Sequence, residues 1–356
     1  MRKFISSAVC VIITALILIS SIKDITLLKI PKSQPQETAA QTASYEDDCK
    51  LRGTIFDRNG VPLVYTQIMS DTYYYREVNK HYTFSTSPLV SGITSEEGLE
   101  DLYEEVLRKN NPTPTNDNDS VGLSIITTID AKMQQEIYNL LNNAKDSIIV
   151  TGSVTVISNA AEVLACVSSP GYDANLFRKD NETRLKLANS PTVRNKALMK
   201  FPFESEHAVI SQSNAVYDFG TETTAQIGKS ASSIRLAADA YNAGTGDNEM
   251  PRMVIAAVDT NDPSKIIAPI ELSGDLPNDK VELTRNKSIE SGKFTAYTDE
   301  SFTGGVYTVY GYFENGDSIF SVAVNIVDDK YDHIDSESDA VKLYSDIANI
   351  VIKYIG

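Results

Sequence analysis

The sequence predicts an α+β fold, in which a mostly antiparallel sheet carries helices on its faces and follows a small β-containing module. The strongest signal is a pair of strand-like runs, 305–313 and 318–327, on either side of Glu314-Asn315-Gly316-Asp317. Asn and Gly supply the turn conformations that a tight hairpin requires. A second hairpin is predicted from the β-branched runs 153–157 and 163–167, which a short connection, 158–162, joins.

Two helical patterns complete this prediction. Asp130 precedes one of them and is a suitable N-cap residue. The other begins near Ser336 and Asp339, whose spacing resembles a capping box. Each pattern places its apolar residues on one face, which is typical of a helix that covers a sheet. The two stripes are Met133, Ile137, Leu140, Leu141 and Ala144, and Leu343, Ile347, Ile350, Val351 and Tyr354.

The N-terminal region reads as an anchor followed by a stalk. Residues 4–22 contain no charge and are long enough to span a hydrocarbon core of about 30 Å, so residues 1–23 are expected to form a membrane anchor. A cleaved signal peptide is the competing interpretation, since Ser20 and Ser21 are small, although no clean cleavage site is present. Residues 24–50 are polar and contain Pro31 and Pro35, which indicates a flexible stalk.

The folded part is expected to begin at residue 51, where two β-rich runs surround Asp57-Arg58-Asn59-Gly60. Apolar residues at helical spacing predict a short amphipathic helix near 99–107. The stretch 110–120 is rich in Pro, Asn and Asp and is placed at a domain boundary. We therefore expect a small module at 51–117 and a larger domain at 118–356.

Composition excludes several function classes. A formal charge of −16 and a pI near 4.7 oppose binding to nucleic acid. The three histidines are far apart in sequence, and the three cysteines have no paired spacing, so no metal site and no cofactor are predicted. Cys166 lies in the middle of a predicted strand, where a buried core thiol is expected rather than a nucleophile.

Several segments, in order, resemble the class B penicillin-binding proteins, the transpeptidases that cross-link peptidoglycan. RGTIFDRNGVPLV at 52–64 and ITTIDAKMQQEIYNLL at 126–141 are similar to the opening segment and to a strand and helix of that family. GSVTVISNAAEVLACVSSPGYDANLF at 152–177, NKAL at 195–198 and TAQIGKSASSIRLAADAYNAG at 224–244 resemble later landmarks. The resemblance implies a penicillin-binding-protein and serine β-lactamase-like transpeptidase domain.

In that family, a nucleophilic Ser and a Lys three residues on form the first active-site box, Ser-x-x-Lys. A gapless match of FPFESEHA, residues 201–208, puts Ser205 at the nucleophile and Ala208 where the Lys belongs. Shifting the match by one residue puts Glu204 and His207 at these positions. Neither alignment retains the pair, since the sole Ser-x-x-Lys of the chain is Ser20 to Lys23 beside the anchor.

The other two boxes are degenerate as well. No Ser in the chain has an Asn two residues on, and Gln212 stands where the serine of the closest match belongs. The region between 208 and 225 is also short, although the family inserts a helical subdomain there. The family's Lys-Thr-Gly box lies on an edge strand, and SGKFTAYTD retains Lys293 but continues with Phe294 and Thr295. Glycine at the third position lets a substrate backbone approach closely, which a Thr side chain hinders.

The sequence therefore predicts a single-pass protein of the cell membrane with its main domain outside the cytoplasm. It is expected to be a non-catalytic pseudo-transpeptidase that contacts peptidoglycan, a peptidoglycan synthase or a division protein. The alternative is an active D,D-transpeptidase that uses Ser205 with His207 or Lys293 as a non-standard base. A third possibility is an unrelated exported binding module that shares the hairpins.

Overall fold

The computed structural model describes the folded part of the chain in segments. Within them, no helix combines the length and the apolar character needed to cross a membrane, and the expected anchor at 4–22 lies outside them. The described residues are 51–70, 73–90, 98–109, 121–142, 151–178, 181–188, 195–198, 210–211, 216–217, 232–247, 249–270, 287–291, 294–302, 306–327 and 337–355.

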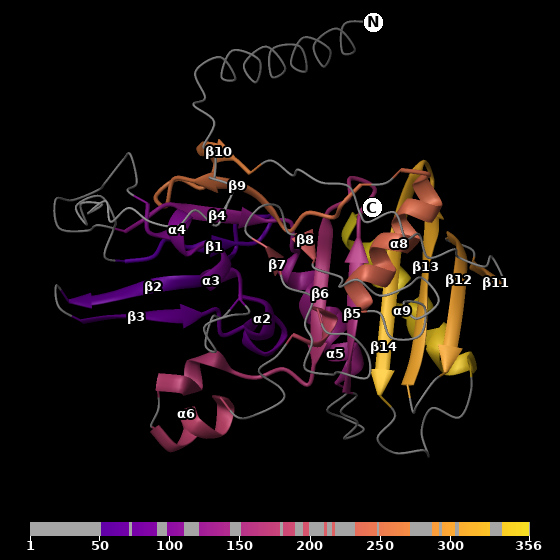
Figure 1. The fold of residues 1–356 in the computed structure, drawn as a ribbon, viewed down its shortest axis with the longest axis horizontal. Coiled ribbons are helices and arrows are strands. Elements are labelled where there is room, and N and C mark those ends of the chain that lie inside the picture. Colours follow the sequence, from indigo (N-terminus) through magenta and orange to yellow (C-terminus); the bar gives the residue numbers. More distant parts are fainter. Residues whose placement is uncertain are drawn as a thin grey trace, which may run out of the picture.

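The larger of two six-stranded sheets has the strand order β11-β12-β13-β14-β5-β6 (Figure 1). Every neighbouring pair in this sheet is antiparallel, as the sequence predicted. Both expected hairpins are present as β5–β6 and β13–β14, and the second of them lies at the centre of the sheet. The strands are β5 (Thr151–Ile157), β6 (Val163–Ser169), β11 (Lys287–Ser291), β12 (Phe294–Phe302), β13 (Val306–Asn315) and β14 (Ser318–Val327).

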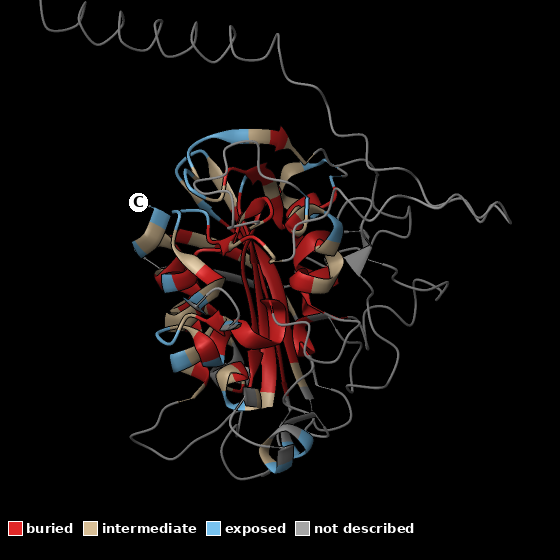
Figure 2. Ribbon diagram, turned by 90° about the vertical axis from the view of Figure 1, so that its left-hand side faces the viewer, coloured by how far each residue is buried: buried red, intermediate tan, exposed pale blue. Residues whose placement is uncertain are grey.

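Helices cover both faces of this sheet. Helix α8 (Ser233–Thr245) crosses one face over β5, β13 and β14, whereas α9 (Glu337–Ile355) covers the other with α5 (Ala131–Leu141) beside it (Figure 1). Most described residues of the predicted stripes are buried, with Ile137 and Ile347 fully enclosed, whereas Leu140, Leu343 and Tyr354 are partly buried and Ala144 lies outside the described residues. The strands between the layers form the buried centre of the molecule (Figure 2). Each fully buried large apolar side chain contributes roughly 1.5–3 kcal/mol to the free energy of folding.

Local signals explain the ends of these elements. Asp130 caps α5, because its carboxylate accepts hydrogen bonds from the backbone N–H groups of Lys132 and Met133 at 3.0 and 2.9 Å. The β13–β14 hairpin closes with Asn315 opposite Ser318, and Gly316 adopts φ +63°, a left-handed conformation that favours glycine. Ser336, the other expected cap, lies outside the described residues.

The second sheet has the order β10-β9-β4-β1-β2-β3. Strands from both sides of the expected boundary share it, because β1 pairs in parallel with β4, and β4 pairs with β9. The boundary stretch 110–120 itself lies outside the described residues. The strands are β1 (Ile55–Phe56), β2 (Pro62–Ser70), β3 (Tyr73–Val78), β4 (Ser124–Thr127), β9 (Val254–Val258) and β10 (Ile266–Pro269).

The turn Asp57-Arg58-Asn59-Gly60 joins this sheet to the start of α5. Asp57 is fully buried, and its carboxylate accepts hydrogen bonds from the backbone N–H groups of Asn59 and Val61 at 2.8 and 2.7 Å. The Asn59 amide also donates to Asp130, the cap of α5, at 3.1 Å. The motif therefore fixes the first hairpin against the larger domain.

The remaining elements are short. The helix expected near 99–107 is two turns, α3 (Leu99–Leu102) and α4 (Glu104–Leu107), because Tyr103 departs from helical geometry with φ −107° and ψ 23°. In the region expected to be shortened, the described residues form one small pair, β7 (Ile210–Ser211) and β8 (Val216–Tyr217). The other helices are α2 (Thr83–Val90), η2 (Ala174–Arg178), α6 (Asn181–Ala188) and η3 (Lys196–Leu198).

Candidate functional site

Ser205, His207 and Lys293 lie outside the described residues, and so do Ala208 and Gln212. The structure therefore describes the surroundings of the candidate site rather than the residues expected to form it. Two neighbouring segments are described, namely residues 195–198 and strand β12, which begins directly after Lys293.

The segment 195–198 is held from two sides. The Asn195 amide donates to the Cys166 Sγ at 3.6 Å, and the backbone N–H of Lys196 donates to the Ser168 hydroxyl at 3.1 Å. Both acceptors belong to β6. From α8, the Ser233 hydroxyl donates to the Ala197 carbonyl at 3.5 Å. The segment resembling the family's approach to the nucleophile is thus fixed between the sheet and α8.

Lys196 is a buried cation that sequence reasoning missed. Its residue is 5% exposed, and burial lowers the pKa of its ammonium group to about 8. Within the described part of the chain, its ammonium group hydrogen-bonds to the Pro170 carbonyl at 3.4 Å and to nothing else. A general base must reach the proton that it accepts. Lys196 is enclosed and bonded to a backbone carbonyl, so its position does not suit this role.

Cys166 is also excluded as a nucleophile in its folded environment. The residue is 1% exposed, and burial raises the pKa of its thiol to about 12, so the reactive thiolate is almost absent at neutral pH. The prediction of a core thiol at this position is confirmed.

Strand β12 has a neighbour on each side where the resemblance implies an open edge. Its residues 294–298 pair with 291–287 of β11 through five consecutive residue pairs, from Ser291↔Phe294 to Lys287↔Thr298. On its other side it pairs with β13 from Thr295 onward. In this chain, β12 is therefore not an edge strand of the sheet, because β11 lies beyond it (Figure 1).

The two residues that replace Thr and Gly of the third box are part of this paired strand. Phe294 is 4% exposed, and its ring packs against Phe313 with a centroid distance of 5.4 Å. Phe313 in turn stacks on Phe320 at 5.5 Å, in the core beneath α9. Thr295 points to the opposite face and lies between Glu290 and Glu314 of the neighbouring strands. Phe294 thus contributes to packing, whereas Thr295 adds a side chain where the family has glycine.

On the α8 face, a polar cluster lies between the helix and the strands. Arg235 and Asp239 form an ion pair of 2.8 Å, and their side chains are 3% and 5% exposed. Nearby, the Tyr310 hydroxyl donates to the Asp299 carboxylate at 3.3 Å. Burial and the carboxylates of Asp299 and Asp239 raise the pKa of Tyr310. Because Arg235 and Asp239 are almost fully enclosed, this cluster supports α8 rather than an open reaction centre.

The architecture defines a class of fold, which the solved structures identify. No protein-family model and no curated protein matches the chain. Solved structures do match, and they are transpeptidase domains of penicillin-binding proteins. The chain therefore has the mixed α+β fold of these domains, and the fold implied by the sequence resemblance is confirmed.

The matches cover nearly the whole of the compared domains. Penicillin-binding protein A from M. tuberculosis, solved as an imipenem acyl-enzyme complex, is 13% identical with a TM-score of 0.60, over 85% of this chain and 98% of that one. The D,D-transpeptidase domain of a peptidoglycan glycosyltransferase from Eggerthella lenta is 14% identical with a TM-score of 0.56, over 87% and 99%. Pseudomonas aeruginosa PBP2 is 14% identical with a TM-score of 0.50, over 79% and 92%. Such low identity shows the fold alone.

Proposed function

We propose that this chain is a non-catalytic, penicillin-binding-protein-like protein of the bacterial cell envelope, anchored by residues 4–22. It acts through contacts with peptidoglycan, with a peptidoglycan synthase or with a division protein. The observation that carries this proposal is the pairing of β11 along β12. In the family that the sequence resembles, the edge of that strand receives the substrate backbone. In this chain, β11 pairs with β12 along that edge.

The sequence supports the same proposal independently. Acylation requires a hydroxyl whose proton a positioned base can accept. In the family that base is the Lys of the Ser-x-x-Lys box, and the two alignments put Ala208 or His207 at its position. Groups of one catalytic unit act together, and the loss of one member can already reduce the rate about 10⁴-fold or more.

The decisive measurement is covalent labelling of the purified full-length chain with a fluorescent penicillin, followed by a denaturing gel and mass spectrometry. The expected result is background labelling of the parent protein, equal to that of Ser205→Ala. A stoichiometric adduct on the parent that disappears in Ser205→Ala would show that the alternative enzyme hypothesis is correct and that the non-catalytic proposal is wrong.

The proposed topology leads to a separate prediction. The apolar segment 4–22 should remain in the mature protein, with residues 51–356 on the outer side of the membrane, because the proposed contacts are made at the wall. Protease added to intact protoplasts is expected to degrade the folded part. If the folded part resists protease until the protoplasts are lysed, the proposed orientation is incorrect.

A further inference from the structure

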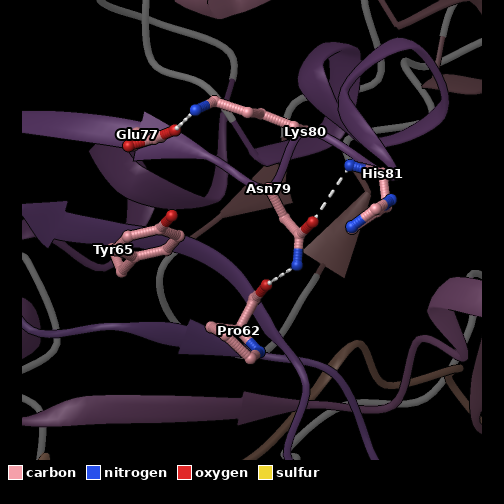
Figure 3. Close-up of a pocket in the computed structure, with 6 residues that line it drawn as sticks. All are labelled: Pro62, Tyr65, Glu77, Asn79, Lys80 and His81. Carbon is pink, nitrogen blue, oxygen red and sulfur yellow. Dashed lines mark hydrogen bonds and ion pairs between the residues drawn. The ribbon is translucent and has the colours of Figure 1, made fainter.

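A surface cavity of about 330 Å³, open to solvent, lies where β2 and β3 meet the loop that leads to α2 (Figure 3). It belongs to the N-terminal part of the fold, on the opposite side of the molecule from β12 (Figure 1). The residues that line it are Pro62, Tyr65, Glu77, Asn79, Lys80 and His81.

Glu77 is the chemically unusual member of this lining. Its side chain is 5% exposed, and among the described residues its one ion pair is with Lys80, at 3.0 Å. The Lys80 side chain is 77% exposed. A carboxylate that is taken out of water needs a partner, but an exposed lysine is held only weakly. Glu77 is therefore a buried carboxylate whose cationic partner, the Lys80 side chain, lies mostly in solvent and can move away from it.

The β2–β3 ladder places two tyrosines on the same face as Glu77. Tyr65 lies directly opposite Glu77 in the β2–β3 ladder, and Tyr75 follows on the same face. The pKa of Lys80 is raised, first by its hydrogen bond with Glu77 and then by the charge of Glu77. Glu77 therefore stabilises an ammonium group at the position of the Lys80 Nζ.

The rim of the cavity is fixed by Asn79. Its amide donates to the Pro62 carbonyl at 2.9 Å, and its side-chain oxygen accepts from the backbone N–H of His81 at 3.1 Å (Figure 3). The backbone on both sides of Lys80 is thus held in place. The Lys80 side chain can move away without disturbing the other walls, because it contributes one exposed ion pair.

We propose that this cavity binds a protonated primary amine at the end of a flexible side chain, carried by a short peptide, with Glu77 as its counter-ion. Lys80 is the internal occupant that the incoming amine displaces. The choice of a short peptide as the carrier rests on the proposed function, in which the chain contacts peptidoglycan. The amine is argued from Lys80, whose own ammonium group pairs with Glu77. The cation-binding chemistry follows from the cavity itself.

Because Lys80 competes with the incoming amine, substitutions at Lys80 and at Glu77 should change the affinity for the amine in opposite directions. If Lys80 occupies Glu77 about nine-tenths of the time, its removal should tighten amine binding about tenfold, because the competent state is then always populated. Lys80→Ala is therefore expected to bind the peptide more tightly than the parent. Glu77→Gln removes the counter-ion and is expected to weaken binding at least tenfold.

The test is calorimetric titration of the full-length chain, in a mild detergent, with the blocked dipeptide acetyl-Ala-Lys-amide. The matched probe is the same dipeptide with an acetylated side-chain amine, which should not bind. The matched control is Lys186→Ala, which removes an exposed lysine, 75% exposed and 2.7 Å from Glu182, elsewhere on the surface. This control should bind as the parent does, and circular dichroism checks the fold of each variant.

Equal binding of the free and acetylated dipeptides would overturn the proposal, and so would unchanged or weaker binding by Lys80→Ala. The second result does not depend on whether Glu77→Gln folds. The outcome is also separable from the proposed function, because penicillin labelling reports on Ser205 and not on this cavity. If penicillin labels Ser205 and the dipeptide still binds as expected to the parent and to the Lys80 and Glu77 variants, the non-catalytic proposal is rejected and the amine site is retained.

Discussion

Replacing Val322 with proline is expected to unfold the larger domain. Val322 is fully buried in β14, opposite Gly311 of β13 on one side and Val156 of β5 on the other. Proline has no N–H to donate, so a ladder hydrogen bond is lost in the interior of the sheet, and its ring does not fit an interior strand. The lost apolar packing beneath α9 adds to this effect.

The matched variant is Val322→Ala, which removes the same packing but keeps the backbone hydrogen bond. It should lower the free energy of unfolding by roughly 2 kcal/mol and leave a folded protein. Thermal unfolding followed by circular dichroism distinguishes the two. A proline variant with the melting temperature of the alanine variant would show that the backbone N–H of Val322 is dispensable to the sheet.

The sequence predicted those parts of the fold that short-range patterns determine. The β13–β14 hairpin follows from alternating apolar residues around a Gly-containing turn, and α5 follows from Asp130 and the stripe behind it. Both patterns are decided within about twenty residues. They could therefore be read without knowledge of the tertiary structure.

Pairings between distant segments could not be predicted in this way. The parallel pairing of Ile55 with Ile125 depends on how the first hairpin docks against the larger domain. Strand β11 reads KSIES, with Ile289 as its one apolar residue, so neither propensity nor alternation marks it as a strand. Its partner β12 supplies the hydrogen bonds that make it one.

The same limit applies to the candidate sites. The degenerate positions Ser205, His207 and Lys293 came from the spacing of the family's boxes, and they remain predictions because the described residues do not include them. Glu77 and Lys196 carry no sequence signal, since both read as ordinary surface charges. Their burial is decided by tertiary packing, so it became visible only in the structure.

Breaking the ion pair beneath α8 is expected to have the second large effect on stability. Arg235 and Asp239 are one helical turn apart, 2.8 Å from each other and almost fully enclosed. Arg235→Met leaves a buried carboxylate without this cation, which should cost about 3–5 kcal/mol in the free energy of unfolding. The double variant Arg235→Met/Asp239→Leu replaces both charges with apolar side chains of similar size and should recover most of the loss.

The pH dependence of these variants identifies the carboxylate as the cause. Burial raises the pKa of Asp239 from 3.8 to about 6, against the opposing effect of Arg235. The folded state therefore binds this proton more tightly than the unfolded state, and the resulting stabilisation is complete below pH 3.8 and lost as the pH rises through 6.

Without Arg235 the pKa of Asp239 should rise further, so Arg235→Met should regain about 1 kcal/mol or more of unfolding free energy between pH 7 and pH 5 relative to the double variant. Urea unfolding of the full-length chain at both pH values, followed by circular dichroism, measures this difference. An Arg235→Met protein as stable as the parent at pH 7, or one that gains nothing relative to the double variant at pH 5, would mean that the charge of Asp239 is compensated by other groups.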